Sequence, residues 1–156
     1  MADETEGLEQ ELDDYKKNVN TDLKAFIEYE RDLLFNARTS GGYVIEYDAH
    51  VQWGIMPTDS LLTSIAACMA IDVVSFLKKM RVEVIDFNIK ASAKRNPTPP
   101  QFFKSVHLDI TIKARNIDTR KMDRAVSLSK EKYCSVYHTC RPDMEHTVAY
   151  EIIPAE

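Results

Sequence analysis

The sequence predicts an α+β fold with antiparallel sheets, and three observations support this prediction. Segments of alternating polar and apolar residues, typical of strands, lie on both sides of one long apolar helix. A second, amphipathic helix follows the most regular of these segments, and a last strand ends the chain. Strands that are grouped together and followed by a helix, instead of strict strand–helix alternation, favour segregated antiparallel sheets. The 156 residues suit a single core.

The long helix is the stretch 60–80, SLLTSIAACMAIDVVSFLKKM, which contains neither Gly nor Pro. Its apolar residues recur at steps of three and four and cover almost the whole circumference, a pattern that predicts a helix in the middle of a core. We expect Thr58, Asp59 or Ser60 to cap its N-terminus. A thin polar stripe shares one face by its spacing and consists of Ser64, Cys68, Asp72 and Ser75.

Three short strands are expected before this helix. Alternation predicts strands over 25–30, 33–37 and 43–47, and the sequence Ser-Gly-Gly is a turn signal between the last two. Together they would form an antiparallel meander. Residues 1–22 are acidic and polar, and we interpret them as an N-terminal extension, helical or disordered, ahead of a domain that covers 23–156.

Three further strands are expected after the long helix. The first two cover 82–95 and 103–115, with a rigid proline-rich loop between them, and the last covers 147–153. In the strand 103–115 the apolar residues alternate with polar ones, which is typical of a strand buried on one face.

The second helix is expected between the last two of these strands, over 120–132. Asp118 or Thr119 would cap its N-terminus. Its inward face would consist of Met122, Ala125, Val126 and Leu128. A break followed by a short helical turn is expected over 133–137.

The composition excludes several classes of protein. A net charge of −5 argues against nucleic acid or an anionic membrane as the main partner. The long helix carries Asp72 near its middle and never reaches about eighteen uninterrupted apolar residues, which argues against a membrane span. The acidic N-terminus has no apolar signal-peptide core, so we expect a cytoplasmic protein. Three cysteines are a poor disulfide framework, and in a cytosolic protein they are inert, metal-binding or redox-active.

The contexts of two cysteines resemble the OsmC family, which includes the organic hydroperoxide resistance proteins. These contexts are AACMAIDVVSFLKKMR around Cys68 and RAVSLSKEKYCSVYHT around Cys134. The likeness extends over about 23–153 and includes SGGYVIEYD, PPQFFKSVHLDITI and Pro57, which lies eleven residues before Cys68. It implies an intertwined homodimer with curved antiparallel sheets around two central helices and with two active sites at the interface.

The resemblance implies thiol-dependent reduction of organic hydroperoxides. Cys68 matches the peroxidatic cysteine, whose thiolate attacks the O–O bond and becomes a sulfenic acid. Cys134 matches the resolving cysteine, which then forms a disulfide with Cys68. A dithiol reductant of the dihydrolipoamide type would restore both thiols. No bound cofactor is implied.

The resemblance also implies an arginine from the meander, held by an acid just before the central helix. Asp59, nine residues before Cys68, matches a Glu found in some subgroups, whereas Thr58 occupies the commoner position. Arg31 resembles the family arginine best, and Arg38 is the alternative. The planar guanidinium would hold the thiolate and the distal peroxide oxygen.

The residues themselves set requirements for this chemistry. The thiolate is the nucleophile, and burial together with the carboxylate of Asp72 disfavours a thiolate at Cys68, so a cation would have to offset both. Cys134 would begin a short helical turn whose N–H groups favour its thiolate. We interpret Asp72 as a hydrogen-bonded structural acid rather than a catalyst. Cys140 matches no family position, and we interpret it as a packing thiol.

We expect no metal site. The four histidines, His50, His107, His138 and His146, show no metal-ligand spacing. Cys134, His138 and Cys140 would be able to hold zinc with one more ligand, but three residues so close in sequence are a weak indication of a site.

Two functions are consistent with these residues. The first is a two-cysteine hydroperoxide reductase, whose apolar dimer-interface pocket would favour organic hydroperoxides over hydrogen peroxide. The expected lining of that pocket is Leu61, Ile65, Phe102 and Phe103. The alternative is an OsmC-fold redox or binding protein with little peroxidase activity, whose cleft would hold an acyl chain or another small hydrophobic ligand. A peroxidase needs Cys68 as a thiolate near neutral pH, whereas a binding protein does not.

Overall fold

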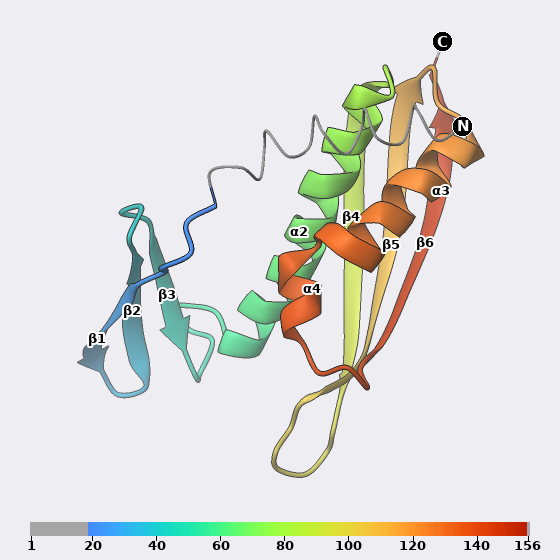
Figure 1. Cartoon of the computed structure of the whole chain (residues 1–156). Helices are drawn as coiled ribbons and strands as arrows, with labels where there is room; N and C mark the ends of the chain where they lie inside the picture. The colour runs from blue at the N-terminus through green and yellow to red at the C-terminus, as the bar shows by residue number, and fades with distance from the viewer. Residues whose placement is uncertain (1–18, 156) are drawn as a thin grey trace. The chain divides into compact units, whose positions relative to one another are not determined.

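The structure, a computed structural model, describes residues 19–155 (Figure 1). These residues form two compact units, 19–61 and 62–155, and each is described by itself. Residues 19–22, the described end of the expected N-terminal extension, contain no helix or strand. The rest of that extension, residues 1–18, lies outside the described residues.

The unit 19–61 contains the predicted antiparallel meander. Its strands are β1 (Ala25–Arg31), β2 (Leu34–Thr39) and β3 (Val44–Asp48), in the order β1-β2-β3. The carboxylate of Asp48 accepts hydrogen bonds from the backbone N–H groups of His50 and Trp53. These bonds fix the start of the connector that leads from the meander to the long helix.

The long helix, α2 (Pro57–Lys79), begins three residues earlier than predicted. Pro57 stands at its first position, where a proline costs no hydrogen bond and its fixed φ already suits a helix. Thr58, Asp59 and Ser60 therefore lie inside the first turn, and the expectation that one of them is the N-cap is wrong. The hydroxyl of Ser60 instead hydrogen-bonds with that of Tyr47 at 2.8 Å.

The unit 62–155 is built on a mixed sheet. Its strands are β4 (Glu83–Arg95), β5 (Phe103–Arg115) and β6 (Glu145–Pro154), in the order β4-β5-β6. The β4–β5 pair is antiparallel as predicted, but β5 and β6 run parallel. The chain between them crosses the face of the sheet as helices, so it enters β6 in the direction of β5. An all-antiparallel sheet is therefore wrong for this unit.

The crossover consists of three helical segments. They are α3 (Thr119–Leu128), the π-helix η1 (Ser129–Tyr133) and α4 (Ser135–Thr139). Asp118 caps α3 as predicted, because its Oδ1 accepts the backbone N–H of Lys121 at 2.8 Å. The predicted single helix over 120–132 is thus an α-helix that widens into a π-helix in its last turn.

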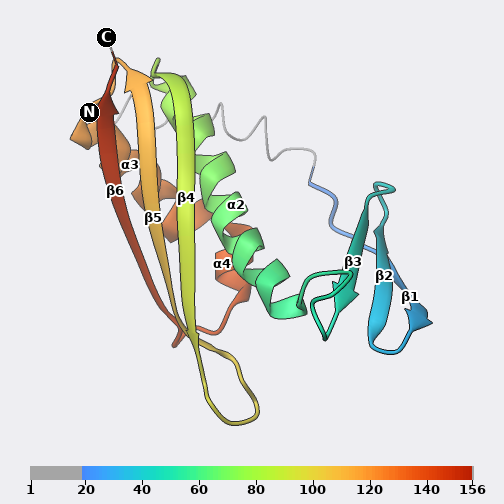
Figure 2. The same cartoon turned by 180° about the vertical axis from the view of Figure 1, so that it is seen from behind.

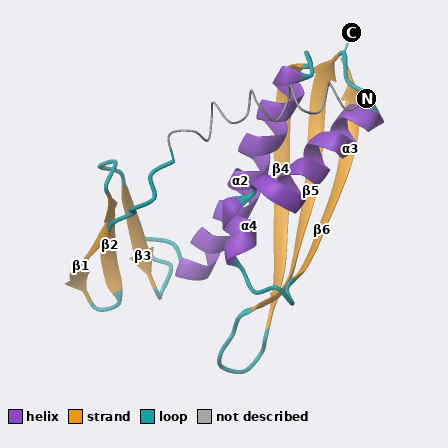
Figure 3. Cartoon of the chain, viewed as in Figure 1, coloured by secondary structure: helices purple, strands orange, loops and turns teal. Residues whose placement is uncertain are grey.

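Helices α2 and α3 cover the same face of this sheet (Figure 1), and the view from behind shows the opposite face (Figure 2). In the view coloured by secondary structure, the helices all lie on one side of the sheet β4-β5-β6 (Figure 3). The core between the two layers takes its largest side chains from α2, β5 and α3. Those with at most 2% of their surface exposed are Ile65, Met69, Val73, Phe76, Leu77, Val106, Leu108, Ile110, Ile112 and Met122. Burial of such side chains contributes about 1.5–3 kcal/mol each.

By length and composition α2 is also apolar enough to cross a membrane, a criterion that the central helix of a globular core meets as well. In this chain Ile65, Met69, Val73 and Phe76 of α2 are fully buried against the sheet and α3. Their burial assigns α2 to the core of its unit.

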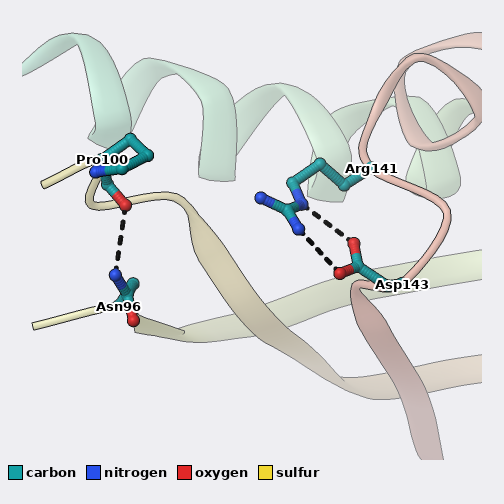
Figure 4. Close-up of polar contacts among 4 residues, drawn as sticks. All are labelled: Asn96, Pro100, Arg141 and Asp143. Atoms are coloured by element: carbon teal, nitrogen blue, oxygen red, sulfur yellow. Dashed lines mark hydrogen bonds and ion pairs between the residues drawn. The ribbon is translucent and has the colours of Figure 1, made fainter.

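The residues expected to line an apolar pocket have different surroundings. Ile65 and Phe103 belong to the core, whereas Leu61 is 41% exposed. The guanidinium of Arg141 lies 3.8 Å from the ring centre of Phe102 and covers it. Two hydrogen bonds to Asp143, at 2.9 and 2.7 Å, hold this guanidinium in place (Figure 4).

A hydrogen bond from Asn96 Nδ2 to the carbonyl oxygen of Pro100, at 3.3 Å, closes the loop between β4 and β5 (Figure 4). Asn96 Nδ2 also donates to the carbonyl oxygen of Thr98 at 2.6 Å. The loop is therefore held by its own side chain, as expected for a rigid proline-rich connection.

Candidate active site

Three polar side chains meet inside the unit 62–155. The sulfur atoms of Cys68 and Cys134 and a carboxylate oxygen of Asp72 all lie within 4.8 Å of one another. Cys68 and Asp72 are four residues apart on α2 and so share a face. Cys134 is fully buried, Asp72 is 1% exposed, and Cys68 is half-buried. The two cysteines singled out from the sequence are therefore brought together, and both are free thiols.

The π-helix places the second cysteine. The backbone N–H of Cys134 donates to the carbonyl oxygen of Ser129 at 2.8 Å, the bond to the fifth preceding residue that defines a π turn. Its wider turn directs Ser129 and Cys134 toward the same carboxylate on α2. The preceding side chain, Tyr133, packs edge-on against Phe76, with ring centres 5.3 Å apart. The crossover is thus anchored to α2 by polar and apolar contacts together.

Asp72 is a buried acid with a defined partner. The hydroxyl of Ser129 donates to Asp72 Oδ2 at 2.9 Å, and both side chains are buried. A buried carboxylate needs such a donor because its desolvation is costly. The prediction that Asp72 is a hydrogen-bonded buried acid is confirmed.

Ser129 is the residue of this site that the sequence analysis missed. A signal for it was present, because it continues the inward face of α3 at the step that follows Met122 and Ala125. A serine on an apolar face has to find a polar partner inside the core. The widening of the helix after Leu128 had no comparable signal in the sequence.

The environment of Cys134 keeps it protonated. Burial, a hydrogen bond with the Cys68 sulfur and the negative charge of Asp72 raise the pKa of the Cys134 thiol to about 12, although the backbone N–H of Tyr137 acts in the opposite direction. The expected effect of the helical turn on the Cys134 thiolate is therefore present, but it does not decide the protonation of this thiol. Cys134 does precede α4, but that helix has five residues, and burial outweighs its N–H groups.

The expected arginine and its acid lie in the unit 19–61. Arg31 ends β1, with its Nη1 3.9 Å from Glu30 Oε1 and its guanidinium 5.6 Å from the ring centre of Trp53. Arg38 is exposed on β2, and Asp59 is exposed in the first turn of α2. The two cysteines belong to the other unit, so the assistance of Cys68 by Arg31 or Arg38 stays a prediction.

The zinc alternative considered from the sequence does not form. Within residues 19–155, the potential metal ligands that approach one another are Cys68, Asp72 and Cys134, and neither His138 nor Cys140 belongs to this group. The thiol of Cys140 instead donates to the carbonyl oxygen of Val136 at 3.4 Å. The four-residue step along α4 that connects these two explains why Cys140 turns back onto its own helix.

In this unit a cysteine on a central helix meets a second cysteine that follows a crossover helix, and both lie over a three-stranded sheet. This arrangement defines a thiol protein of the OsmC-like class. Residues 48–149 match the model of the family described as OsmC-like protein, and the chain belongs to this family. It is 31% identical over 134 residues to Protein YhfA of Escherichia coli strain K12, a match that covers 85% of this chain and 100% of YhfA. The resemblance inferred from the cysteine contexts is confirmed.

Solved structures show the same fold. A hypothetical protein from Aquifex aeolicus VF5 is 28% identical with a TM-score of 0.80, and the match covers 88% of this chain and 100% of that one. An organic hydroperoxide resistance protein OsmC from Legionella pneumophila has a TM-score of 0.63 at 14% identity, over 86% and 99% of the two chains. At that identity the second likeness shows the fold alone.

The residues matched by the family model include some of the expected site residues and leave out others. It includes Asp59, Cys68, Asp72 and Cys134, which all fall within 48–149. The two arginines of the meander lie before this range. The assignment of an arginine thus rests on the sequence resemblance of the meander and not on the family model.

The raised pKa predicts how Cys134 reacts with an alkylating agent. In the double variant Cys68→Ser/Cys140→Ser, which leaves Cys134 as the one cysteine, we expect carboxamidomethylation of the folded protein to stay slow. Its rate should rise about tenfold per pH unit from about pH 7 to 10 without a plateau, because the thiolate fraction rises by that factor below the pKa. Mass spectrometry of timed samples measures the rate.

The same variant in urea provides the control, since the exposed thiol should level off near an ordinary cysteine pKa of about 8.5. A plateau below about pH 9 in the folded variant would show that burial does not hold Cys134 as a thiol.

Proposed function

We propose that this protein reduces organic hydroperoxides with Cys68 as the attacking thiolate and Cys134 as the resolving thiol. The observation that carries the proposal is the approach of the two sulfur atoms to within 4.8 Å, across two helices of an OsmC-like fold. Membership of a family that includes hydroperoxide resistance proteins supports a redox or peroxide-related role.

The two cysteines differ in a way that suits these roles. Cys68 is half-buried, whereas Cys134 is fully buried, so Cys68 is the more accessible of the two residues. The pKa of about 12 keeps Cys134 as a thiol. A buried thiol is a poor first nucleophile, but it is well protected until a sulfenic acid forms beside it.

The reaction proceeds in two balanced steps. The Cys68 thiolate attacks the terminal oxygen of the hydroperoxide, the O–O bond breaks, and the alkoxide takes a proton and leaves as an alcohol. Cys68 is then a sulfenic acid. The Cys134 sulfur attacks the Cys68 sulfur, the S–O bond breaks, and water leaves with the thiol proton of Cys134. An external dithiol, of the dihydrolipoamide type in the resemblance stated above, supplies two electrons and two protons to restore both thiols.

An arginine of the meander assists the first step in this proposal. Arg31 holds the thiolate and the distal peroxide oxygen, and Asp59 orients its guanidinium. The contacts of Arg31 with Glu30 and Trp53 support a defined position for this side chain. Arg38 is the alternative donor, because it lies exposed on the neighbouring strand.

Two copies of the chain complete the working unit in this proposal. All seven residues of β1 are exposed, among them Phe26, Ile27 and Tyr29, and Ile71 on α2 is 50% exposed. A small three-stranded sheet with so much apolar surface in water is not stable by itself. A second subunit that covers β1 and the exposed side of α2 accounts for the apolar surface of both elements. A reducing cytoplasm suits an enzyme that works with free thiols.

A second candidate function is an OsmC-fold redox or small-ligand protein with little peroxidase activity. It is favoured by the carboxylate of Asp72, which lies beside both sulfur atoms and whose negative charge adds to the raised pKa of the Cys134 thiol. In this case the cysteines stay reduced in the presence of peroxide, and the apolar surface holds a hydrophobic ligand.

A single-turnover experiment separates the two functions. The reduced protein receives one equivalent of cumene hydroperoxide, and peptide mass mapping follows its three cysteines. We expect a Cys68–Cys134 disulfide, formed faster than with hydrogen peroxide, because the two sulfur atoms are already neighbours. Cys68→Ser should prevent all oxidation, and Cys134→Ser should stop at a sulfenic acid that dimedone traps. Cys140→Ser is the matched control and should behave like the wild type.

Thiols that stay unreacted in the wild type for many minutes would exclude the peroxidase and favour the binding protein. Oxidation of Cys140 in place of Cys134 would contradict the assignment of the resolving thiol.

The arginine assignment is tested by the rate of that first oxidation. We expect Arg31→Ala to slow the loss of the Cys68 thiol by about 10²-fold, the usual effect of removing one donor to a developing charge. Arg38→Ala, a matched control of the same charge, should slow it by less than about threefold. The opposite order would assign the role to Arg38, and two small effects would show that neither arginine assists Cys68.

The dimer is tested by sedimentation velocity at micromolar protein concentration. We expect twice the mass of the chain for the wild type and a shift toward the single-chain mass for Ile71→Glu, which places a charge on the exposed apolar side of α2. Lys78→Ala, which changes an exposed polar residue of the same helix, is the control. A wild-type protein that sediments as a single chain would contradict the proposal.

A further inference from the structure

The position of Asp72 is not explained by peroxide reduction. Its carboxylate is almost fully buried and lies beside the two thiols, and neither step of that reaction uses it. Two sulfur atoms and one carboxylate oxygen in a compact triangle are instead the donor set of a site for a thiophilic cation. We propose that the reduced site binds one Zn²⁺ ion through Cys68 Sγ, Asp72 and Cys134 Sγ.

The spacing of the three donor atoms fits such an ion. Zinc is bound at about 2.3 Å by sulfur and about 2.0–2.2 Å by oxygen, so donors at the corners of a tetrahedron lie roughly 3.5–3.8 Å apart. The donor atoms of Cys68, Asp72 and Cys134 lie within 4.8 Å of one another. Closing the triangle around the ion requires movements on the order of 1 Å, shared by three side chains.

The charges also fit. Two thiolates and a carboxylate would repel one another in a buried site, and a divalent cation between them reverses that repulsion into attraction. The thiols release their two protons to the solvent when the ion binds. The carboxylate that opposes a thiolate in the free protein thereby becomes a ligand in the metal-bound protein.

The surroundings of the three ligands are those of a metal site. Ser129 donates to Asp72 Oδ2 at 2.9 Å, a contact of the kind that orients metal-bound carboxylates. Cys134 is held by its backbone bond to Ser129, and Cys68 and Asp72 stand on one face of α2. Since Cys68 is half-buried, an ion and a fourth ligand such as water can reach the site from its side.

Metal binding would exclude peroxide chemistry at the same sulfur atoms. The ion would draw electron density from the Cys68 sulfur that attacks a peroxide and would occupy the space beside it, so the bound form should oxidise more slowly. Formation of the Cys68–Cys134 disulfide would remove two of the three ligands and release the ion. The two states are therefore alternatives at one site.

Binding is measured on the reduced full-length protein, with no peroxide present. Cd²⁺ serves as the probe, because its bonds to thiolates absorb in the near ultraviolet, and Zn²⁺ affinity follows from competition with a chromophoric chelator. We expect one ion per chain. Cys68→Ser and Cys134→Ser should each abolish the thiolate absorption expected for two sulfur ligands, whereas Cys140→Ser should leave absorption and affinity unchanged.

Asp72→Asn tests the carboxylate, because the amide keeps the size of the side chain and its ability to accept the bond from Ser129. We expect it to weaken Zn²⁺ binding about tenfold or more, and Ser129→Ala to weaken it by about tenfold through the orientation of the carboxylate. Circular dichroism confirms that each variant is folded. Wild-type affinity in folded Asp72→Asn, or ion binding that survives in Cys68→Ser and Cys134→Ser and is lost in Cys140→Ser, would overturn the proposal.

The experiments distinguish a failure of the zinc proposal from a failure of the peroxidase proposal. The peroxide experiment is performed with a chelator present, so its outcome does not depend on metal binding. The titration contains no oxidant, so it does not depend on peroxidase activity. A protein that oxidises its cysteines but shows no Cd²⁺–thiolate band would keep the first proposal and exclude the second.

Discussion

The hydrogen bond from Ser129 to Asp72 connects the two helices on which the site depends. It is buried, and one partner carries a carboxylate that would be costly to leave without a donor in a core. The bond therefore constrains where the end of the crossover can lie against α2. Cys134 follows within the same turn, so its distance from Cys68 is set by the position of Ser129. The approach of the two sulfur atoms is in this sense a consequence of supplying a hydrogen-bond donor to the buried carboxylate of Asp72.

That acid also gives the site its electrostatic character. Cys134 is held as a thiol with a pKa of about 12 by burial, by Cys68 and by Asp72, even though it directly precedes a short helix. A peroxidase with this arrangement needs a positive charge near Cys68, which the meander can supply as an arginine. A zinc ion would meet the same need from within the triangle of ligands. The two proposals are thus two answers to one electrostatic problem.

Much of the architecture was predictable because it depends on periodic burial. The apolar circumference of α2 and the alternation in β5 predicted the elements that carry the core, and the contexts of Cys68 and Cys134 predicted their meeting. The direction of β6 was not predictable from alternation, since a parallel and an antiparallel edge strand bury the same residues. The first turn of α2 was misjudged because Thr58, Asp59 and Ser60 are all good caps, whereas the fixed φ of Pro57 begins the helix earlier.

The site was predictable to the level of which residues meet, but not to the level of their protonation. The pKa of Cys134 depends on how deeply the residue is buried, which no local pattern encodes, and burial outweighs the predicted effect of the helical turn for that reason. Ser129 was hidden because a lone serine on an apolar helix face has many explanations until its partner is seen. The π turn is a property of the whole crossover and had no local residue signature.

The π turn determines the direction in which the side chains after it point around the helix axis. A π-helix is equivalent to one residue inserted into an α-helix, and each residue of an α-helix turns the chain by about 100°. Had the crossover continued as a regular α-helix, the side chain of residue 134 would leave the face that Ser129 occupies, and the sulfur atom would no longer be directed at α2. The pairing of the two thiols is therefore a matter of chain length as much as of chemistry. A chain one residue shorter between Ser129 and the cysteine would direct the sulfur atom at α2 as a regular α-helix, because residues four apart share a face.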